Sequence, residues 1–321
     1  MLKIKKFTET DSEFRELARI DNLVNHDSID HPDDDKRDWE IRDRSLIRDR
    51  LLLYKDKILV GAMYYSQGRE KNKRTTFFTL NIDPAYNTHE SRELLFNQML
   101  EEIKLFDSNK ILTGVYDHPN YDLVKQFLVD KKFKLVQTNR EYSCDITKIN
   151  IEKYQPLIKK LESEGIKFYD SKEEMKDWPN HYKKLEELTW TYHQDFPIPN
   201  GVKHTRTPFE QAMKIQRDFE QNYYGTEIVA VKDVRYIGST DLEVYYKSEP
   251  HKAWTNGLGV LKDYRRRGIA TALKIKAIEK LIEKGVTEIR TDNEENNPMY
   301  KINVALGFEP APFSLEYMKE I

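Results

Sequence analysis

The sequence predicts an α/β protein made of two similar domains, and three observations support this. The chain has 321 residues, which favours two domains over one. The order of predicted strands and helices in the first half returns in the second half, as expected after duplication of a domain. Apolar content is low at 38%, but 19 Tyr, 14 Phe and 4 Trp can still build two cores.

The first half begins with a hairpin, in which strands 51–54 and 58–65 turn around Lys55-Asp56-Lys57. A third strand, a helix, a strand, a short helix and a final strand follow. These elements are expected at 76–82, 91–106, 111–116, 121–130 and from Phe133 onwards.

The second half has the same order. Strands are expected at 226–232, 237–245 and 254–260, and then a helix at 271–284, a strand at 287–291, a short helix that ends at Leu306 and a strand from Phe308. A charged helical stretch at 151–165 lies between the two halves. We therefore expect one domain at 1–150 and a second at 151–321.

A basic, glycine-containing loop joins strand 254–260 to helix 271–284. Its residues, 265–270, read Arg-Arg-Arg-Gly-Ile-Ala. The first amides of a helix lack intrahelical partners, and the helix dipole adds positive potential there. Gly268 permits close approach of a ligand, and arginines suit a diphosphate. The loop therefore indicates an anion site, with a basic surface turn as the alternative.

The ordered block from about residue 255 to 308 resembles the core of the GNAT superfamily of N-acetyltransferases. The family signature R/Q-x-x-G-x-G/A reads Arg265-x-x-Gly268-x-Ala270, and the block closes with Leu306-Gly307-Phe308. The resemblance implies tandem GNAT-like domains, similar in plan to mycothiol-synthase-like proteins. Each domain would be a mixed, mostly antiparallel sheet flanked by helices.

The resemblance also implies that acetyl-CoA is the co-substrate of the second domain. The loop amides would wrap the pyrophosphate, the pantetheine arm would follow the preceding strand, and the Leu258 amide would polarise the acetyl carbonyl. The residues implied in cofactor binding are Leu258, Gly259, Val260, Arg265, Arg266, Arg267, Gly268, Ile269, Ala270, Thr271, Asn296, Asn297 and Asn303.

The first copy departs from the family pattern at the equivalent loop. Residues 87–91 read Asn-Thr-His-Glu-Ser, without a glycine, and Glu90 would repel a pyrophosphate. Lys131-Lys132-Phe133 replaces Leu-Gly-Phe. We therefore expect a structural first domain and one CoA per chain; a weak second cofactor site is the alternative.

The implied reaction is direct attack of a primary amine on the acetyl group, without a covalent enzyme intermediate. It requires a base for the amine and a proton for the departing thiolate. The position of the family's tyrosine acid is Asn303 here, which cannot donate. Tyr300, one turn earlier, is the candidate acid, with solvent as the alternative. Glu243 is favoured as the base over Asp241 and His251.

Other activities fit parts of the same sequence pattern. A non-catalytic acyl-CoA-binding or regulatory protein is the main alternative, and transfer of a longer acyl group is another. The loop lacks the Gly-Lys-Ser/Thr of a P-loop nucleotide enzyme. A net charge of −2 argues against nucleic acid and mildly favours a small-molecule amine, although a protein amine also fits. Oligomeric state stays open.

The remaining expectations concern location, metal and the one cysteine. Without an apolar leader or span, the chain is expected to be cytoplasmic, with no membrane contact. Cys144 is expected to be a small core residue of the first domain and no nucleophile. The His- and Asp-containing run 26–35 has no ordered ligand spacing, so no metal is expected. The Pro-rich segment 190–201, with His193 and Asp195, is expected to be a loop near the acceptor or packed on the core.

Overall fold

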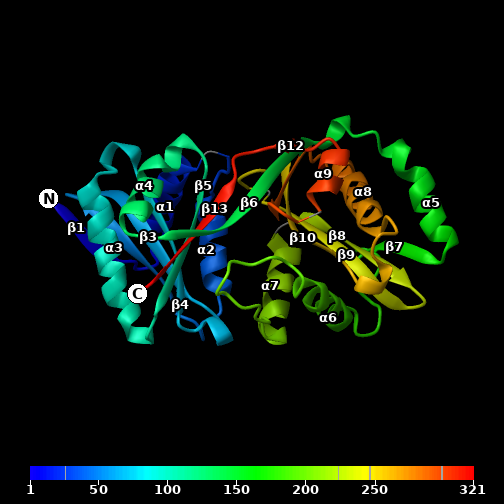
Figure 1. The fold of residues 1–321 in the computed structure, drawn as a ribbon, viewed down its shortest axis with the longest axis horizontal. Coiled ribbons are helices and arrows are strands. Elements are labelled where there is room, and N and C mark those ends of the chain that lie inside the picture. Colours follow the sequence, from blue (N-terminus) through cyan, green and yellow to red (C-terminus); the bar gives the residue numbers. More distant parts are fainter. Residues whose placement is uncertain (26, 223, 246, 298) are drawn as a thin grey trace. The chain divides into compact units, whose positions relative to one another are not determined.

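The computed structural model describes residues 1–321 except His26, Tyr223, Tyr246 and Pro298, and it divides into two compact units (Figure 1). Unit 1 comprises Met1–Asn139, Ile198–Thr205 and Pro312–Ile321, and unit 2 comprises Arg140–Pro197 and Arg206–Ala311. These bounds differ from the predicted 1–150 and 151–321, because strand β6 (Lys134–Asp145) contributes to both units and the C-terminal segment belongs to unit 1.

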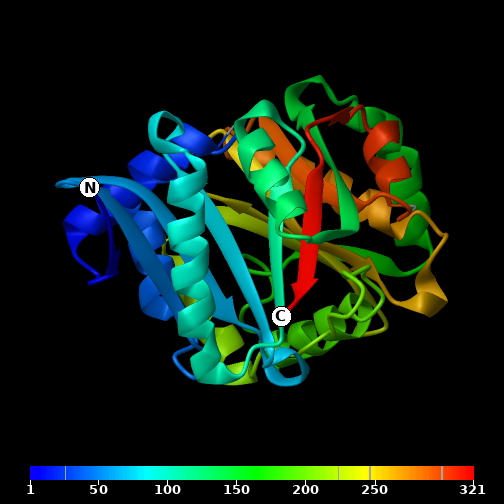
Figure 2. The ribbon, with the colours of Figure 1, turned by 60° about the vertical axis from the view of Figure 1, so that its left-hand side comes forward.

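The sheet of unit 1 contains the last strand of the chain. Its order is β1 (Leu2–Lys6), β2 (Arg48–Lys55), β3 (Ile58–Gln67), β4 (Thr75–Ile82), β5 (Lys110–Tyr116), β13 (Ser314–Glu320) and the first half of β6. β4 and β5 are parallel, and the other pairs are antiparallel. Figure 2 shows β13, in red, beside β5.

Helices cover both faces of this sheet. Leu51 and Leu53 of β2 belong to the core under α3 (His89–Ile103) and α4 (Asp122–Asp130). Leu52, between them, belongs to the core under α1 (Asp11–Val24) and α2 (Pro32–Ile41). This alternation follows from the two-residue period of a strand, so both faces of β2 are apolar and buried.

Unit 2 has the second sheet, whose order is the second half of β6, then β11 (Glu288–Glu294), β10 (Lys252–Val260), β9 (Arg235–Val244), β8 (Tyr224–Lys232) and β7 (Ile166–Asp170). β10 and β11 are parallel, whereas β7, β8, β9 and β10 pair antiparallel. The two-residue strand β12 (Glu309–Pro310) pairs with β6.

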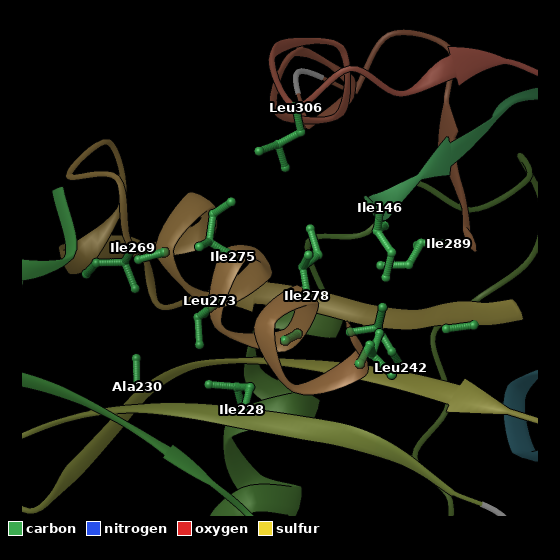
Figure 3. Close-up of a cluster of buried hydrophobic side chains, with 14 of the residues drawn as sticks. Ile146, Ile228, Ala230, Leu242, Ile269, Leu273, Ile275, Ile278, Ile289 and Leu306 are labelled. Atoms are coloured by element: carbon green, nitrogen blue, oxygen red, sulfur yellow. The ribbon is translucent and has the colours of Figure 1, made fainter. Parts of the chain in front are cut away.

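Helix α8 (Ile269–Glu283) fills the core on one face of this sheet, together with α5 (Gln155–Ser163) and α9 (Tyr300–Ala305). Figure 3 shows Ile269, Leu273, Ile275 and Ile278 of α8 directed toward Ile228, Ala230 and Leu242 of the sheet or toward Ile289 and Leu306. α6 (His181–His193) packs on the other face and is followed by α7 (Phe209–Asn222).

The predicted elements of both halves form, with ends shifted by a few residues. Two expectations need correction. The strand expected from Phe308 is only β12, after which the chain continues to β13, and the segment expected as a loop from Trp190 is helical as far as His193. In the His- and Asp-containing run 26–35, His26 lies outside the described residues. None of the described helices has the length and apolar character needed to cross a membrane.

Candidate active site

The β10 strand of unit 2 has one open edge. It pairs with β11 only over Lys252–Trp254 in the register described, whereas its pairing with β9 continues to Val260. A register shift between Thr255 and Gly257 marks a bulge. Beyond Trp254, β10 and β11 are therefore separated, and the second half of β10 presents backbone groups to the gap.

The amide of Leu258 faces this gap. The Leu261 amide donates to Ile237 of β9 at 2.9 Å, and backbone groups of a strand alternate in direction. The amides of Leu258 and Val260 therefore face away from β9. The Val260 carbonyl confirms this direction, because it accepts a hydrogen bond from Nε of Arg265 at 2.8 Å.

Gly259 lies against the ring of Tyr192 on the α6 face. A Cβ at Gly259 would lie 2.1 Å from Cδ2 of Tyr192, so no side chain fits there. The Tyr192 hydroxyl is 3.1 Å from Oγ of Ser239, and burial raises the pKa of this tyrosine. Gly259 therefore allows an α6 aromatic ring to press against the β10 backbone.

The loop after β10 ends in an uncapped helix start. Arg266 and Gly268 both have left-handed backbones, with φ of 62° and 88°. Gly268 is the N-cap of α8 and offers no side chain to the helix. In the described part of the chain, no side-chain cap satisfies the first-turn amides of Ile269, Ala270 and Thr271. These donors and the helix dipole make a concentrated positive site.

Two of the three loop arginines are held by carboxylates. Arg265 Nη2 lies 2.6 Å from Asp195, which also pairs with Lys262 at 3.0 Å, and these contacts lower the pKa of Asp195. Arg267 Nη2 lies 2.5 Å from Glu164, the pKa of which is lowered in the same way. Arg266 is exposed and has no ion pair with any described residue.

The corresponding helix start in unit 1 is capped. Oγ1 of Thr88 accepts the Ser91 amide at 3.2 Å, and Oγ of Ser91 donates to the Tyr86 carbonyl at 2.8 Å. Arg92 donates to the Asn87 carbonyl at 3.0 Å. This helix therefore offers fewer donors to an anion than α8 does, and Glu90 adds a negative charge.

The Asn-rich turn holds itself together by short-range hydrogen bonds. The amide and Nδ2 of Asn296 each donate to the Glu294 carboxylate at 2.9 Å. Oδ1 of Asn297 accepts the Met299 amide at 3.0 Å, just before α9. These two asparagines therefore lie at the end of β11, next to the gap beside β10.

Asn303 is 3% exposed and both ends of its amide are used. Oδ1 accepts from Nζ of Lys274 at 2.5 Å, and Nδ2 donates to Oδ1 of Asn293 at 2.8 Å. The partly buried ring of Tyr300 packs against the same core, with the Arg140 guanidinium carbon 5.9 Å from its centroid.

Sequence reasoning missed Glu227, which is 7% exposed and is the cross-strand neighbour of Asp241. Both side chains lie on the α6 face, and Asn256, at the bulge, donates to Asp241 at 3.2 Å. Burial raises the pKa of both carboxyl groups, and the charge of Asp241 raises that of Glu227 further. The sequence does show a glutamate directly before the apolar run 228–231, which could have marked Glu227 as a buried carboxyl group. Its pairing with Asp241, however, depends on strand register.

Glu243, the predicted base, lies two residues farther along β9. Its cross-strand neighbour is Trp254, where β10 is still paired on both sides, whereas Asp241 lies opposite Gly257, beside the bulge. The Glu243 carboxylate accepts from the Tyr245 hydroxyl at 3.2 Å. His251 lies at the other end of β10, where its carbonyl accepts the Thr287 amide.

Cys144 lies in unit 2, which corrects its expected place in the first domain. It is buried in the core under α8, and burial raises the pKa of its thiol to about 11. The thiol is therefore neutral at physiological pH, which makes it a poor nucleophile. The described residues include no group of three or more His, Cys, Asp and Glu side chains placed to hold a metal ion.

The open edge of β10 and the uncapped start of α8 form the candidate site, and both lie in the part of the chain that a family comparison matches. Residues 183–306 match the acetyltransferase (GNAT) family. This segment, most of which lies in unit 2, is therefore an acetyltransferase domain of the GNAT family, and that family uses acetyl-CoA as co-substrate.

Solved structures show the same tandem fold over the whole chain. A tandem GNAT protein from the clavulanic acid biosynthesis pathway has a TM-score of 0.79 at 16% identity, covering 100% of this chain and 98% of its own. A GCN5-related N-acetyltransferase from Sphaerobacter thermophilus has a TM-score of 0.68 at 14% identity, covering 99% and 95%.

A glucosamine N-acetyltransferase region of a fungal multi-domain β-N-acetylglucosaminidase has a TM-score of 0.73 at 15% identity, covering 99% of this chain and 38% of its own. No curated protein is significantly similar in sequence.

Proposed function

We propose that unit 2 binds one acetyl-CoA and transfers its acetyl group directly to a primary amine. The uncapped start of α8 beside the open edge of β10 carries this proposal. The amides of Ile269, Ala270 and Thr271 would bind the pyrophosphate, with Arg266 adding charge. The pantetheine arm would enter between β10 and β11, beside Asn296 and Asn297.

The Leu258 amide would polarise the acetyl carbonyl, because it faces the gap and lies two residues beyond the bulge. The amine would approach from the α6 face, where Glu227 and Asp241 lie. An amine is mostly protonated at neutral pH, so it must lose a proton before it attacks. We propose the Glu227–Asp241 pair as the acceptor of that proton, in place of Glu243.

The carboxyl pair suits this role because of its electrostatics. Glu227 is buried and Asp241 is half-buried beside it. Two adjacent carboxyl groups do not ionise together readily, so the pair holds one proton at neutral pH. The remaining negative charge attracts an ammonium group, and the raised pKa brings its basicity closer to that of an amine. The acceptor is therefore a cationic amine, and we favour a small molecule.

The test is an amine screen with free thiol as the readout, including amino sugars because one structural neighbour is named for glucosamine acetylation. With an active amine, kcat/KM should rise with pH through the pKa of the pair. Glu227→Gln removes the repulsion and should move this rise to lower pH at reduced rate. Glu243→Gln, on the same face, is the matched control and should leave the rise in place.

Two results would overturn parts of this proposal. If the pH at which kcat/KM rises changes in Glu243→Gln but not in Glu227→Gln, Glu243 is the base instead of the pair. Specific acetyl-CoA binding with no turnover on any amine would favour the alternative of a non-catalytic acyl-CoA-binding protein.

A further inference from the structure

Lys274 is a buried cation without a carboxylate partner among the described residues. It lies on the second turn of α8 and is 1% exposed. Its Nζ donates to Oδ1 of Asn303 at 2.5 Å and lies 4.3 Å from the centroid of the Phe308 ring. One neutral hydrogen bond and one ring contact do not offset the removal of an ammonium group from water. An apolar residue of similar volume would therefore stabilise this core better.

The hydrogen bonds of Asn303 connect Lys274 to the gap beside β10. Nδ2 of Asn303 donates to Oδ1 of Asn293 at 2.8 Å. Asn293 lies in the part of β11 beyond Arg290, the last β11 residue paired with β10 in the described register. Lys274, Asn303 and Asn293 thus join α8, α9 and the separated end of β11. The ammonium group is thus linked, through one asparagine, to the separated end of β11.

We propose that Lys274, oriented by Asn303, donates the proton to the departing thiolate of CoA. This inference rests on the acetyl-CoA site proposed above. The amine nitrogen forms a bond to the acetyl carbon, the carbon–sulfur bond breaks, and its electron pair leaves on sulfur. The sulfur then takes a proton from Nζ of Lys274, which becomes a neutral amine.

Proton balance is completed by the other face of the site. A protonated amine loses two protons on becoming an amide. The Glu227–Asp241 pair takes up the first before attack and releases it to water, and it takes up the second from the nitrogen of the tetrahedral intermediate. Exchange with water restores the pair and Lys274 after the products leave. Asn303 itself cannot supply a proton, because an amide has no readily ionised hydrogen. It serves as a positioning residue for Lys274.

The environment of Lys274 makes the transfer favourable. Burial lowers its pKa to about 7, below the value of about 8.5 for an ordinary thiol. A proton therefore moves downhill from the lysine to the thiolate. The titratable group that acts on Lys274 is Cys144 of β6. Burial raises the pKa of that thiol to about 11, so it stays protonated and does not pair with the lysine.

Calorimetric titration with CoA and with desulfo-CoA, which lacks the sulfur, tests the proposal without a known acceptor. In the wild-type complex, Lys274 and the thiol together hold one proton between about pH 7 and 8.5; the proton is on the thiol, which donates a hydrogen bond to the neutral amine of Lys274. The preference for CoA over desulfo-CoA should therefore be greatest between about pH 7 and 8.5 and should fall on both sides. We expect a maximum preference of about tenfold.

Two variants separate charge from proton donation. Lys274→Met should bind desulfo-CoA normally but lose the pH-dependent preference for CoA. Lys274→Arg retains a positive charge, because arginine does not lose its proton at these pH values. It should therefore keep a preference for CoA but lose turnover with any amine that the wild type acetylates. Turnover that is lost in Tyr300→Phe but kept in Lys274→Arg would instead return the role of acid to Tyr300.

The outcomes are distinct. A preference for CoA that is flat with pH in the wild type, or that persists in Lys274→Met, would reduce Lys274 to a packing residue. The wild-type pH profile decides this even if Lys274→Met does not fold. If the wild type binds neither ligand, the proposed acetyl-CoA site itself is wrong.

Discussion

Asp195 and Arg265 form an ion pair of 2.6 Å that fastens the loop after β10 to the segment after α6. The same carboxylate holds Lys262 at 3.0 Å. Arg265 also donates to the Val260 carbonyl, so its guanidinium shapes the loop from within. The basic charge of the loop therefore has two roles: Arg265 and Arg267 order it, while Arg266 stays available to a ligand.

Arg266→Glu should weaken CoA binding without destabilising the protein. Arg266 is exposed and has no ion pair among the described residues, so only its attraction to phosphate is lost, and Glu adds repulsion. We expect Kd to rise about tenfold or more, with an unchanged Tm. Arg267→Glu is the comparison: because it also breaks the pair with Glu164, it should lower the Tm as well. Equal affinity of Arg266→Glu and wild type would place the phosphates elsewhere.

Gly259→Ala should disrupt packing far more than Gly257→Ala. A methyl group at Gly259 would lie 2.1 Å from the Tyr192 ring, whereas one at Gly257 would lie 3.7 Å from its hydroxyl, an ordinary contact. Overpacking of a buried site costs about 1–3 kcal/mol. Thermal unfolding of the two variants should therefore show a clear loss of Tm only for Gly259→Ala, and Tyr192→Leu should partly restore it. Equal effects of the two alanines would show that the ring yields easily.

Calorimetry should find one CoA per chain. The first turn of α3 is capped by Thr88, whereas α8 begins at a glycine without a cap. Thr88→Gly removes the cap from unit 1, yet Glu90 and the missing basic loop should still prevent binding. Two sites of similar affinity in the wild type would contradict the assignment of unit 1 as structural.

A buried carboxyl group in unit 1 should make stability depend on pH. Oδ2 and Oδ1 of Asp21 accept hydrogen bonds from Tyr64 and Asn81, both at 2.7 Å. Burial raises the pKa of Asp21 to about 7, above its unfolded value near 4. The stabilising effect of this raised pKa is complete below about pH 4 and is lost as pH rises to about 7, because only the unfolded state releases the proton readily in this window.

Asp21→Asn removes this titration and isolates the effect. Relative to wild type, the variant should gain unfolding free energy as the pH is raised from about 5 to 8. Urea unfolding at the two pH values measures this difference. A wild-type-minus-variant difference that is independent of pH would mean that Asp21 titrates normally.

The sequence predicted the part of the site that depends on local order. The strand, the loop 265–270, Gly268 and helix α8 are consecutive, so their arrangement follows from periodicity and helix-end signals. Glu227 was missed because its meeting with Asp241 depends on strand register, which a single strand does not reveal.

Other features depend on contacts that are distant in the sequence. β13 pairs with β5, about two hundred residues earlier in the chain, so its place in unit 1 could not be read from its own pattern. Lys274 interrupts an otherwise apolar helix face, and only the fold shows that its side chain meets Asn303 instead of solvent.

The uncapped start of α8 is expected to bind the pyrophosphate of acetyl-CoA, and Gly268→Asp tests this binding site. An aspartate there would place its carboxylate on the amides that the pyrophosphate needs. Gly165→Asp, at a φ of 83° against 88° for Gly268, is the control for the left-handed backbone, and Gly268→Ala is the control for the contact that a Cβ there would make with Leu157 at 2.7 Å.

Thermal shifts should be compared with acetyl-CoA, CoA and ATP. Binding at this site predicts that acetyl-CoA and CoA raise the Tm of the wild type and of Gly165→Asp, that ATP does so much less, and that Gly268→Asp loses the shift. An undiminished shift in Gly268→Asp, or no shift by any CoA species in the wild type, would contradict it.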